Sequence, residues 1–270
     1  MAKTALITGA SEGIGYELVK LFAKDGYDCV LVARNKEKMD QLAGEVEKLY
    51  GIKTRVIAKD LSLPEAAQEI FDELKGAAVP VDVLVNNAGL GLYGDFAESD
   101  MDMNMHLIQV NLVSLTKLTW LFVPGMIARK SGKIMTVGSI ASFAPSPRFC
   151  LYNASKAYVL YFSEALGEEL KGTGVTVTCL CPGATRTQWH TRANSENIRL
   201  HQFSRMIDAK TVAELGYQAL LRGKRLAIPG CDNNIAALFS KFAPRAVVLK
   251  FARFLTGKSS CSSPCCCSRY

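Results

Sequence analysis

Seven short apolar segments that alternate with helical patterns constrain the fold of this 270-residue chain more than any other feature. The segments are rich in β-branched residues and apolar throughout, which suits strands covered on both faces. A single helix between successive strands implies right-handed crossovers. We therefore expect an α/β fold, a doubly wound parallel sheet of seven strands with helices on both faces. The expected strands are 3–8, 28–33, 53–58, 82–86, 133–138, 175–181 and 225–229, and the helices are 14–25, 35–50, 64–75, about 98–122, 152–171 and 211–222.

Composition and charge divide the chain into a body and a tail. With 49% hydrophobic and 21% charged residues the chain has ample material for a core. Residues 233–270 hold six cations and no Asp or Glu, so they account for +6 of the net +7. Residues 1–232 carry a net charge of only +1 and are thus expected to form one domain that does not bind nucleic acid. Near the N-terminus the run "ALIT" is too short for a signal peptide, and no stretch has the roughly 18 uninterrupted apolar residues of a spanning helix.

A glycine-rich turn, "TGASEGIG", follows the first expected strand and contains Thr8, Gly9, Gly13 and Gly15. Glycines at this place allow a tight turn and a close approach of the backbone, and they leave the helix N–H groups and dipole facing an anion. A dinucleotide pyrophosphate fits that description, although an ordinary glycine-rich turn would look the same. The spacing also departs from the common Gly-x-Gly-x2-Gly fingerprint.

The end of the second expected strand bears on the cofactor. An acidic residue there would bind the adenosine ribose 2′-hydroxyl, but this chain has Arg34. A guanidinium can clamp a 2′-phosphate with two hydrogen bonds, so the residue favours NADP(H) over NAD(H). The alternative is a solvated arginine at a helix start. Glu12, inside the glycine turn, would lie near such a phosphate and weighs against it.

Two further strand ends fall at the same expected ligand edge. The third strand ends in Asp60-Leu61 and the fourth in "NNAG", residues 86–89. Asn side chains can satisfy backbone groups in a turn, and Ala-Gly leaves room for a flat ring. Taken singly, each is explained as well by loop chemistry.

In "LYNASKAY", residues 151–158, only Tyr152 has a lysine four positions on, Lys156. Positions i and i+4 share a helix face, and a nearby cation lowers the pKa of a tyrosine. A hydride added to a carbonyl leaves an alkoxide that needs a proton, which such a tyrosine supplies. The sequence therefore predicts Tyr152 as general acid/base with Lys156 beside it, whereas Tyr158 and Tyr161 have no such partner.

Taken together, the ordered set of motifs resembles the short-chain dehydrogenase/reductase family. The matching pieces are "TGASEGIG", Asp60-Leu61, "NNAG", Asn111, Ser139 thirteen residues before Tyr152, "YNASK" and Pro182-Gly183. The body is similar to the NADPH-dependent 3-ketoacyl and hydroxysteroid type of carbonyl reductase. The resemblance implies a Rossmann-like fold, a homodimer or homotetramer, and an enzyme without a metal that acts on a CH–OH or C=O group.

The same resemblance assigns residues to roles. It implies a catalytic tetrad of Asn111, Ser139, Tyr152 and Lys156, in which Ser139 donates to the substrate oxygen and Asn111 holds a water. The residues implied to bind the cofactor are Thr8, Gly9, Ser11, Glu12, Gly13, Ile14, Gly15, Arg34, Asp60, Leu61, Asn87, Ala88, Gly89, Tyr152, Lys156, Pro182, Gly183, Thr185 and Thr187.

A long segment, about 184–208, separates the sixth strand from the next helix, and in the family this region is a substrate lid. Its apolar residues are Trp189, Ile198, Leu200, Phe203 and Met206, with Leu92, Phe143, Pro145 and Phe149 on other loops. They favour an apolar carbonyl substrate, though packing under a lid would explain them equally well. The three histidines show no metal spacing.

Residues 233–258 form a predicted helical extension that Pro244 divides in two. In 245–255 three cations occupy one arc of the helix and the apolar side chains occupy the opposite one. Such a helix can contact an anionic membrane from the cytoplasm, or it can dock on this domain or a partner subunit with its charges solvated. The Ser/Cys-rich end, 259–270, is expected to be disordered, and its four cysteines are candidates for palmitoylation.

The function that we expect is the NADP(H)-dependent interconversion of a carbonyl and a secondary alcohol on an apolar small molecule. The alternative is a catalytically silent NADP(H)-binding or membrane-associated scaffold protein. An intact Tyr152–Lys156 pair disfavours that alternative, because a silent protein has no need of both.

Overall fold

A seven-stranded parallel sheet with helices on both faces forms the body of the chain, as the sequence predicts. The computed structural model describes residues 2–195, 198–199 and 206–257. The strand order is β3-β2-β1-β4-β5-β6-β9, and every neighbouring pair is parallel. The strands are β1 (Thr4–Thr8), β2 (Asp28–Ala33), β3 (Thr54–Ala58), β4 (Val83–Asn86), β5 (Gly132–Val137), β6 (Val175–Leu180) and β9 (Leu226–Ala227).

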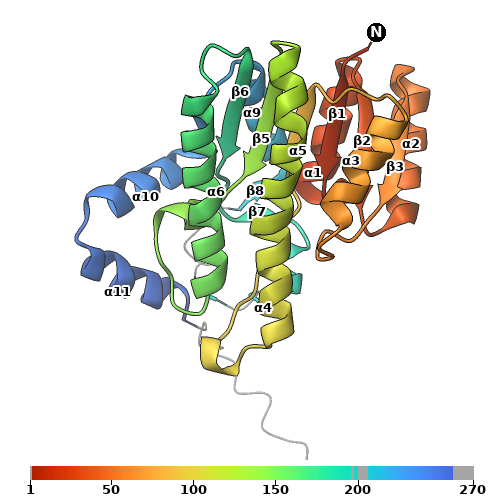
Figure 1. Ribbon diagram of the computed structural model, residues 1–270. Coiled ribbons are helices and arrows are strands. Elements are labelled where there is room, and N and C mark those ends of the chain that lie inside the picture. Colours follow the sequence, from red (N-terminus) through yellow and green to blue (C-terminus); the bar gives the residue numbers. More distant parts are fainter. Residues whose placement is uncertain (1, 196–197, 200–205, 258–270) are drawn as a thin grey trace, which may run out of the picture.

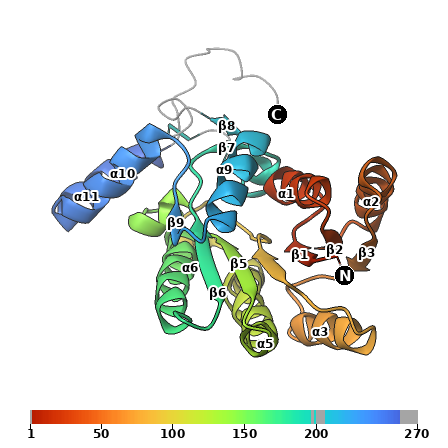
Figure 2. The ribbon, with the colours of Figure 1, turned by 90° about the horizontal axis from the view of Figure 1, so that it is seen from above.

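Two helical layers enclose the sheet (Figure 1, Figure 2). One layer contains α1 (Gly13–Lys24), α2 (Lys36–Tyr50) and α9 (Ala209–Leu221), and the other contains α3 (Ala66–Gly76), α5 (Leu115–Ala128) and α6 (Cys150–Glu169). Strand β1 is buried at all five positions. Its Ala5 and Ile7 pack in the core under the first layer, and Leu6 packs under the second. This double burial explains why the strands read as continuous apolar runs.

The strand order reverses between β1 and β4, where β1 pairs with β2 on one side and with β4 on the other. In open α/β sheets ligands bind beyond the carboxyl ends of the strands at such a switch point. The glycine turn follows β1 and the "NNAG" turn follows β4, so both lie at this place.

The helix expected at 98–122 differs from the structure in one informative way. A short 3₁₀ turn, η1 (Phe96–Glu98), leads to α4 (Met101–Ile108), and a π-helical turn, η2 (Gln109–Ser114), joins α4 to α5. π-Helical turns are frequent at functional sites, and this one contains Asn111. The combined helix 101–128 is long and apolar enough to span a membrane by composition, and 44% of its most apolar window is buried inside the protein.

Smaller differences concern element ends. The helix expected to start at Pro64 starts at Ala66, and the last strand of the sheet has only two residues. Within the expected lid, β7 (Thr185–Arg186) pairs with β8 (Ile207–Asp208), and α7 (Trp189–Arg192) lies between them in sequence. Leu200 and Phe203 lie outside the described residues, as does 259–270. The extension begins two residues early, with α10 (Cys231–Phe242) and α11 (Arg245–Leu255) on either side of Pro244.

Candidate active site

The glycine turn is a backbone cradle that side chains would fill. Gly9 and Gly13 have φ angles of +66° and +60°, which other L residues rarely adopt. A Cβ on Gly9 would lie 2.7 Å from the Asn87 Nδ2, and a Cβ on Gly15 would collide with the carbonyl oxygen of Gly9. Helix α1 then starts at Gly13 with no side-chain cap and no acidic residue in its first turn. Its free N–H groups fit an anion such as a pyrophosphate.

The "NNAG" turn is fastened to this cradle. The Thr8 hydroxyl accepts hydrogen bonds from the backbone N–H groups of Asn87 and Ala88, both at 3.0 Å. The Asn87 side chain donates to the carbonyl oxygens of Thr8 and Gly9 at 2.8 and 3.3 Å. These bonds fix the two strand ends relative to each other, so both turns present one continuous surface.

Glu12 weighed against a phosphate-binding role for Arg34 in the sequence, but in the structure two cations lie beside Glu12. Arg34 is exposed and lies 4.0 Å from the Asp60 carboxylate. Glu12, which weighed against a phosphate here, is held between Lys38 at 3.8 Å and Arg192 of α7 at 2.8 Å. Two cations therefore balance its charge. Lys38 and Arg192 were not expected at this place, because their approach to Glu12 depends on the fold.

Lys156 is a buried cation at the centre of the site. Its Nζ donates to the Val137 carbonyl oxygen at 2.8 Å and lies 5.8 Å from the centre of the Tyr152 ring. A Cβ on Gly89 would lie 3.2 Å from this Nζ and 3.5 Å from the Asn111 Oδ1. Burial lowers the pKa of Lys156 to about 8, against the opposing influence of the Cys179 and Cys181 thiols.

The pKa of Tyr152 moves in the direction opposite to the one expected from its lysine. Burial raises the pKa to about 12, while the hydrogen bond with Ser139 pulls it the other way. Lys156 does not offset the burial, because its ammonium points to the Val137 carbonyl. Without ligand, Tyr152 is therefore a phenol at neutral pH rather than a tyrosinate.

Ser139 and Asn111 are both held by the elements around α6. Ser139 caps the 3₁₀ turn η3 (Ile140–Phe143) by accepting from the Ala141 N–H at 3.1 Å. The Asn111 side chain accepts from the Leu90 N–H at 2.8 Å and donates to the Leu90 carbonyl and the Ser155 hydroxyl. Both of its N–H donors are thus used, and a water here would have to donate to a lone pair of its Oδ1.

Two serines that the sequence reading passed over connect these groups. Ser155 donates to the Tyr152 carbonyl at 2.7 Å and accepts from Asn111. Ser142 donates to the Lys156 carbonyl at 2.7 Å and accepts from the Ser139 N–H at 3.2 Å. Ser155 lies inside the "YNASK" motif, but nothing local distinguishes either serine. The other tyrosines are placed elsewhere: Tyr158 hydrogen-bonds Thr116, and Tyr161 is exposed.

The remaining residues with an expected cofactor role line the loops around the cradle. Thr187 lies against Gly13, and Thr185 donates to the Gly183 carbonyl at 3.0 Å. Pro182 accepts from the Ile140 N–H at 2.8 Å. Leu61 is buried in the core, whereas Ile14 is half-buried and packs against it. Ser11 is half-buried in the glycine turn.

Trp189 of α7 packs against Tyr152. The ring centres of Trp189 and Tyr152 are 4.9 Å apart, and the indole also rests against Gly91, where a Cβ would overlap it. The Tyr152 ring centre is also 5.9 Å from that of Phe149, which is 5.1 Å from that of Tyr93. Tyr152 therefore has aromatic neighbours, and the lack of a Cβ at Gly91 lets Trp189 lie against it.

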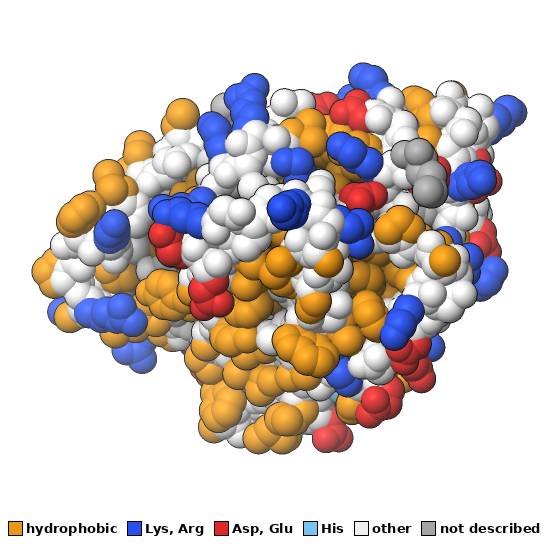
Figure 3. All heavy atoms as spheres, turned by 45° about the horizontal axis from the view of Figure 1, so that its top comes forward, with side chains coloured by type: hydrophobic (Ala, Val, Ile, Leu, Met, Phe, Trp, Pro, Cys, Tyr) orange, Lys and Arg blue, Asp and Glu red, His pale blue; other side chains and the backbone are white. Residues whose placement is uncertain are grey.

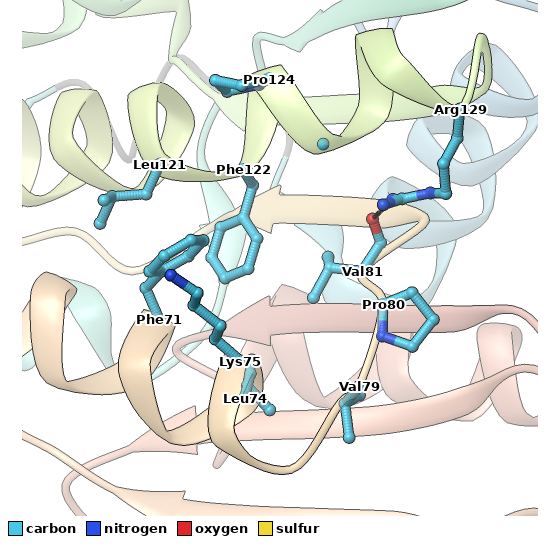
Figure 4. A pocket seen from close by; sticks show the side chains of 11 residues that line it. Phe71, Leu74, Lys75, Val79, Pro80, Val81, Leu121, Phe122, Pro124 and Arg129 are labelled. Atoms are coloured by element: carbon cyan, nitrogen blue, oxygen red, sulfur yellow. Dashed lines mark hydrogen bonds between the residues drawn. The ribbon is translucent and has the colours of Figure 1, made fainter.

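A separate hollow of about 280 Å³ lies between α3 and α5 (Figure 4). Phe71, Leu74 and Phe122 line it, with Lys75 and Arg129 at its border. Arg129 donates to the Val81 carbonyl there at 2.8 Å. None of the tetrad residues borders this hollow, so it does not belong to the site at the carboxyl edge.

Comparison with known proteins gives a consistent result. A family model described as short chain dehydrogenase matches residues 3–198. A very-long-chain 3-oxoacyl-CoA reductase of Anas platyrhynchos is 39% identical over 184 residues, which cover 66% of this chain and 58% of that protein. The chain thus spans about 58% of the length of that curated relative.

Solved structures agree in fold over nearly the whole chain. A short-chain dehydrogenase from Sphingobium yanoikuyae in complex with NADPH has a TM-score of 0.80 at 31% identity, covering 88% of this chain and 93% of that one. The bulky-bulky ketone specific alcohol dehydrogenase from Comamonas testosteroni has a TM-score of 0.75 at 28% identity, covering 90% and 99%.

The Trp189–Gly91 contact predicts a change in fluorescence. The chain has two tryptophans, so Trp120→Phe leaves Trp189 as the only indole. In that background Gly91→Ala should move the indole off Tyr152 into water and shift its emission to the red. Gly44→Ala, where a Cβ meets nothing within 4 Å, is the control and should leave emission unchanged. Identical spectra for all three proteins would contradict this placement of Trp189.

Proposed function

Because the chain belongs to the short-chain dehydrogenase family, we propose that it is an NADP(H)-dependent oxidoreductase that interconverts a carbonyl and a secondary alcohol on an apolar substrate. The observation that carries the proposal is the convergence of Tyr152, Lys156, Ser139 and Asn111 beside an uncapped helix N-terminus. The printed names of the relatives include a 3-oxoacyl-CoA and a ketone as substrates, which are both carbonyl compounds. The chain spans only about 58% of the length of that relative, so we propose its activity rather than transfer it from the relative.

The residues of the cradle fit a nicotinamide dinucleotide, because the three glycines leave a backbone surface that side chains would block. The α1 N-terminus would bind the pyrophosphate, Arg34 the 2′-phosphate, and Gly89 would leave room for the nicotinamide end beside Lys156. When bound, the cofactor supplies or accepts a hydride.

We propose that Tyr152 donates the proton that the alkoxide needs after hydride transfer. A phenol with a raised pKa stays protonated until an alkoxide forms next to it, and it then donates its proton to that oxygen. Ser139, which hydrogen-bonds Tyr152, would donate to the same oxygen and stabilise its charge. Once the tyrosinate has formed, its charge would attract the Lys156 ammonium, whose Nζ lies 5.8 Å from the centre of the ring, and Asn111 would hold a water beside the lysine. In the oxidative direction Tyr152 accepts the proton.

A catalytically silent NADP(H)-binding or scaffold protein is the alternative. Such a protein would need the glycine cradle but not a cation that is 94% buried next to a tyrosine, because burying an ammonium costs free energy. Lys156 at 6% exposure therefore favours the enzyme.

The surface of the second helical layer bears on assembly and location. Trp120 of α5 and Tyr161 of α6 are 71% and 69% exposed, which suits a homodimer or homotetramer formed through these helices. We propose a cytoplasmic protein that consists of a catalytic domain (1–232), a basic extension (233–258) in contact with a membrane, and a tail (259–270).

Removing the proton donor should abolish turnover and spare the cofactor site. Tyr152→Phe is expected to lower kcat for ketone reduction by about a thousandfold or more, while the Kd for NADPH changes less than about threefold. Tyr158→Phe is the matched control, because its hydroxyl binds Thr116 outside the site. Near wild-type kcat in Tyr152→Phe would remove the tyrosine from the mechanism.

The lowered pKa of Lys156 predicts the pH dependence of reduction. The ammonium is present below a pKa of about 8 and is lost as the pH rises through it, so kcat/KM should fall on the alkaline side of that value. Lys156→Met should lower kcat/KM throughout and remove this limb. A wild-type profile that stays flat from about pH 7 to about pH 10 would contradict the role of the ammonium.

Arg34 should determine the preference for the phosphorylated cofactor. Arg34→Ala is expected to raise the Kd for NADPH by about tenfold to a hundredfold, because charge-assisted hydrogen bonds to the 2′-phosphate are lost, and to leave NADH binding unchanged. Lys36→Ala removes a nearby cation that pairs with Asp40 at 2.8 Å, and it should have little effect. Equal binding of NADPH and NADH by the wild type would defeat the assignment.

A further inference from the structure

Helices α10 and α11 form an arm (residues 231–255) that projects from the body beside α6 (Figure 1). Inward-facing Ala237, Val248 and Ala252 are its buried side chains. Leu255 is half-buried, and eight further large apolar side chains of the arm are exposed by 39% to 74%: Ile235, Leu238, Phe239, Phe242, Val247, Leu249, Phe251 and Phe254. Exposed apolar surface on this scale marks an interaction site.

The exposed apolar residues form one surface across both helices. On α10, Ile235, Leu238 and Phe242 lie one helical turn apart on the side away from buried Ala237. On α11, Val247, Phe251 and Phe254 lie together on one face. The rings of Phe239 and Phe251, 6.2 Å apart, join the two helices. Figure 3 shows hydrophobic and basic side chains together on this projecting part, at the left.

The charges of the arm identify the kind of partner. Lys241, Arg245, Lys250 and Arg253 are exposed around the apolar surface, and Asp232 in the first turn of α10 is the one acidic residue of 231–255, so the arm carries a net charge of +3. A second copy of the chain docked through this face would bring two surfaces of the same net charge together. An anionic phospholipid surface complements both the cations and the apolar side chains, because basic residues flanking an apolar helix face bind the headgroups while the apolar face enters the acyl boundary.

The arm is tied to the substrate side of the candidate active site. The Tyr93 hydroxyl donates to the Thr256 carbonyl, directly after α11, at 2.8 Å. From Tyr93 the ring contacts lead through Phe149 to Tyr152, at centre-to-centre distances of 5.1 and 5.9 Å. In the segment 184–208, the Arg199 guanidinium lies 4.9 Å from the centre of the Phe254 ring, and the backbone N–H of Arg199 donates to the Gly257 carbonyl at 3.0 Å. Two aromatic rings thus separate the end of α11 from the catalytic tyrosine.

We propose that the α10–α11 arm docks on an anionic phospholipid bilayer and that the site takes its substrate from that bilayer. The substrate is then an amphiphilic carbonyl compound with a hydrocarbon chain, which leaves the acyl region along the aromatic wall of Phe149, Tyr93 and Trp189. In Figure 1 the N-terminus, where β1 begins, is at the top, and α11 lies toward the opposite end of the molecule. The candidate active site lies at that opposite end, beyond the carboxyl ends of the strands. The proposal rests on the proposed reductase function, whose substrate class it narrows.

The test uses the full-length protein and vesicles of phosphatidylcholine with or without phosphatidylserine. The wild type should sediment with the mixed vesicles and much less with phosphatidylcholine alone. Leu238→Ser and Phe242→Ser, which alter side chains facing away from the body, should each weaken binding by about tenfold. Leu49→Ser removes an equally exposed leucine from α2 and is the control, which should bind as the wild type does.

Activity on two ketones connects docking to the substrate. With vesicles present, the Leu238→Ser/Phe242→Ser double variant should lose about tenfold or more in kcat/KM for a long-chain ketone carried in the bilayer. Its kcat/KM for a short water-soluble ketone should stay at the wild-type value. Equal vesicle binding by the wild type and the double variant would overturn the proposal, as would an equal loss on both ketones.

Two further results would also decide the question. If the double variant changes the molar mass in solution instead of vesicle binding, the face is an interface between copies and the proposal fails. If the wild type binds the vesicles as expected but reduces no carbonyl with either cofactor, the proposed function fails while docking itself stands.

Discussion

The buried ammonium of Lys156 is the constraint around which the site is built. A cation at 6% exposure with one carbonyl partner at 2.8 Å is costly to bury, and its lowered pKa expresses that cost. Three elements make room for the Lys156 ammonium or bind it. The Val137 carbonyl of β5 accepts its hydrogen bond, and Gly89 of the "NNAG" turn leaves space beside it. The π-helical turn places Asn111 close by. A site for a passive binding protein would not need this arrangement.

The cofactor cradle and the proton-transfer group depend on one set of backbone contacts. Thr8 joins the end of β1 to the turn after β4, and Ser142 joins the turn after β5 to α6. Because these bonds involve backbone groups at neighbouring strand ends, the distance between the glycine turn and Tyr152 is set by the sheet itself. Helix α7 contacts both parts, with Arg192 on Glu12 and Trp189 on Tyr152.

Much of this architecture could be predicted from the sequence, since strands buried on both faces leave continuous apolar runs and the glycine turn has a local pattern. The strand positions, the doubly wound sheet and the family follow from such signals. The π-helical turn at Asn111 has no local sequence signal, and the raised pKa of Tyr152 could not be predicted because it depends on burial in the fold and on where the Lys156 ammonium points. Similarly, helical periodicity indicated an apolar face on 245–255, but only the fold shows that Val248 is covered while Phe251 and Phe254 are exposed.

The proposed function requires that a hydride pass directly between a nicotinamide at the glycine cradle and a carbonyl carbon beside Tyr152. It is tested most directly by supplying NADPH that carries deuterium at the transferable C4 position, together with a long-chain ketone, and analysing the alcohol by mass spectrometry. We predict one deuterium on the carbinol carbon of every product molecule. Alcohol without deuterium, or no alcohol with either NADPH or NADH, would contradict the account.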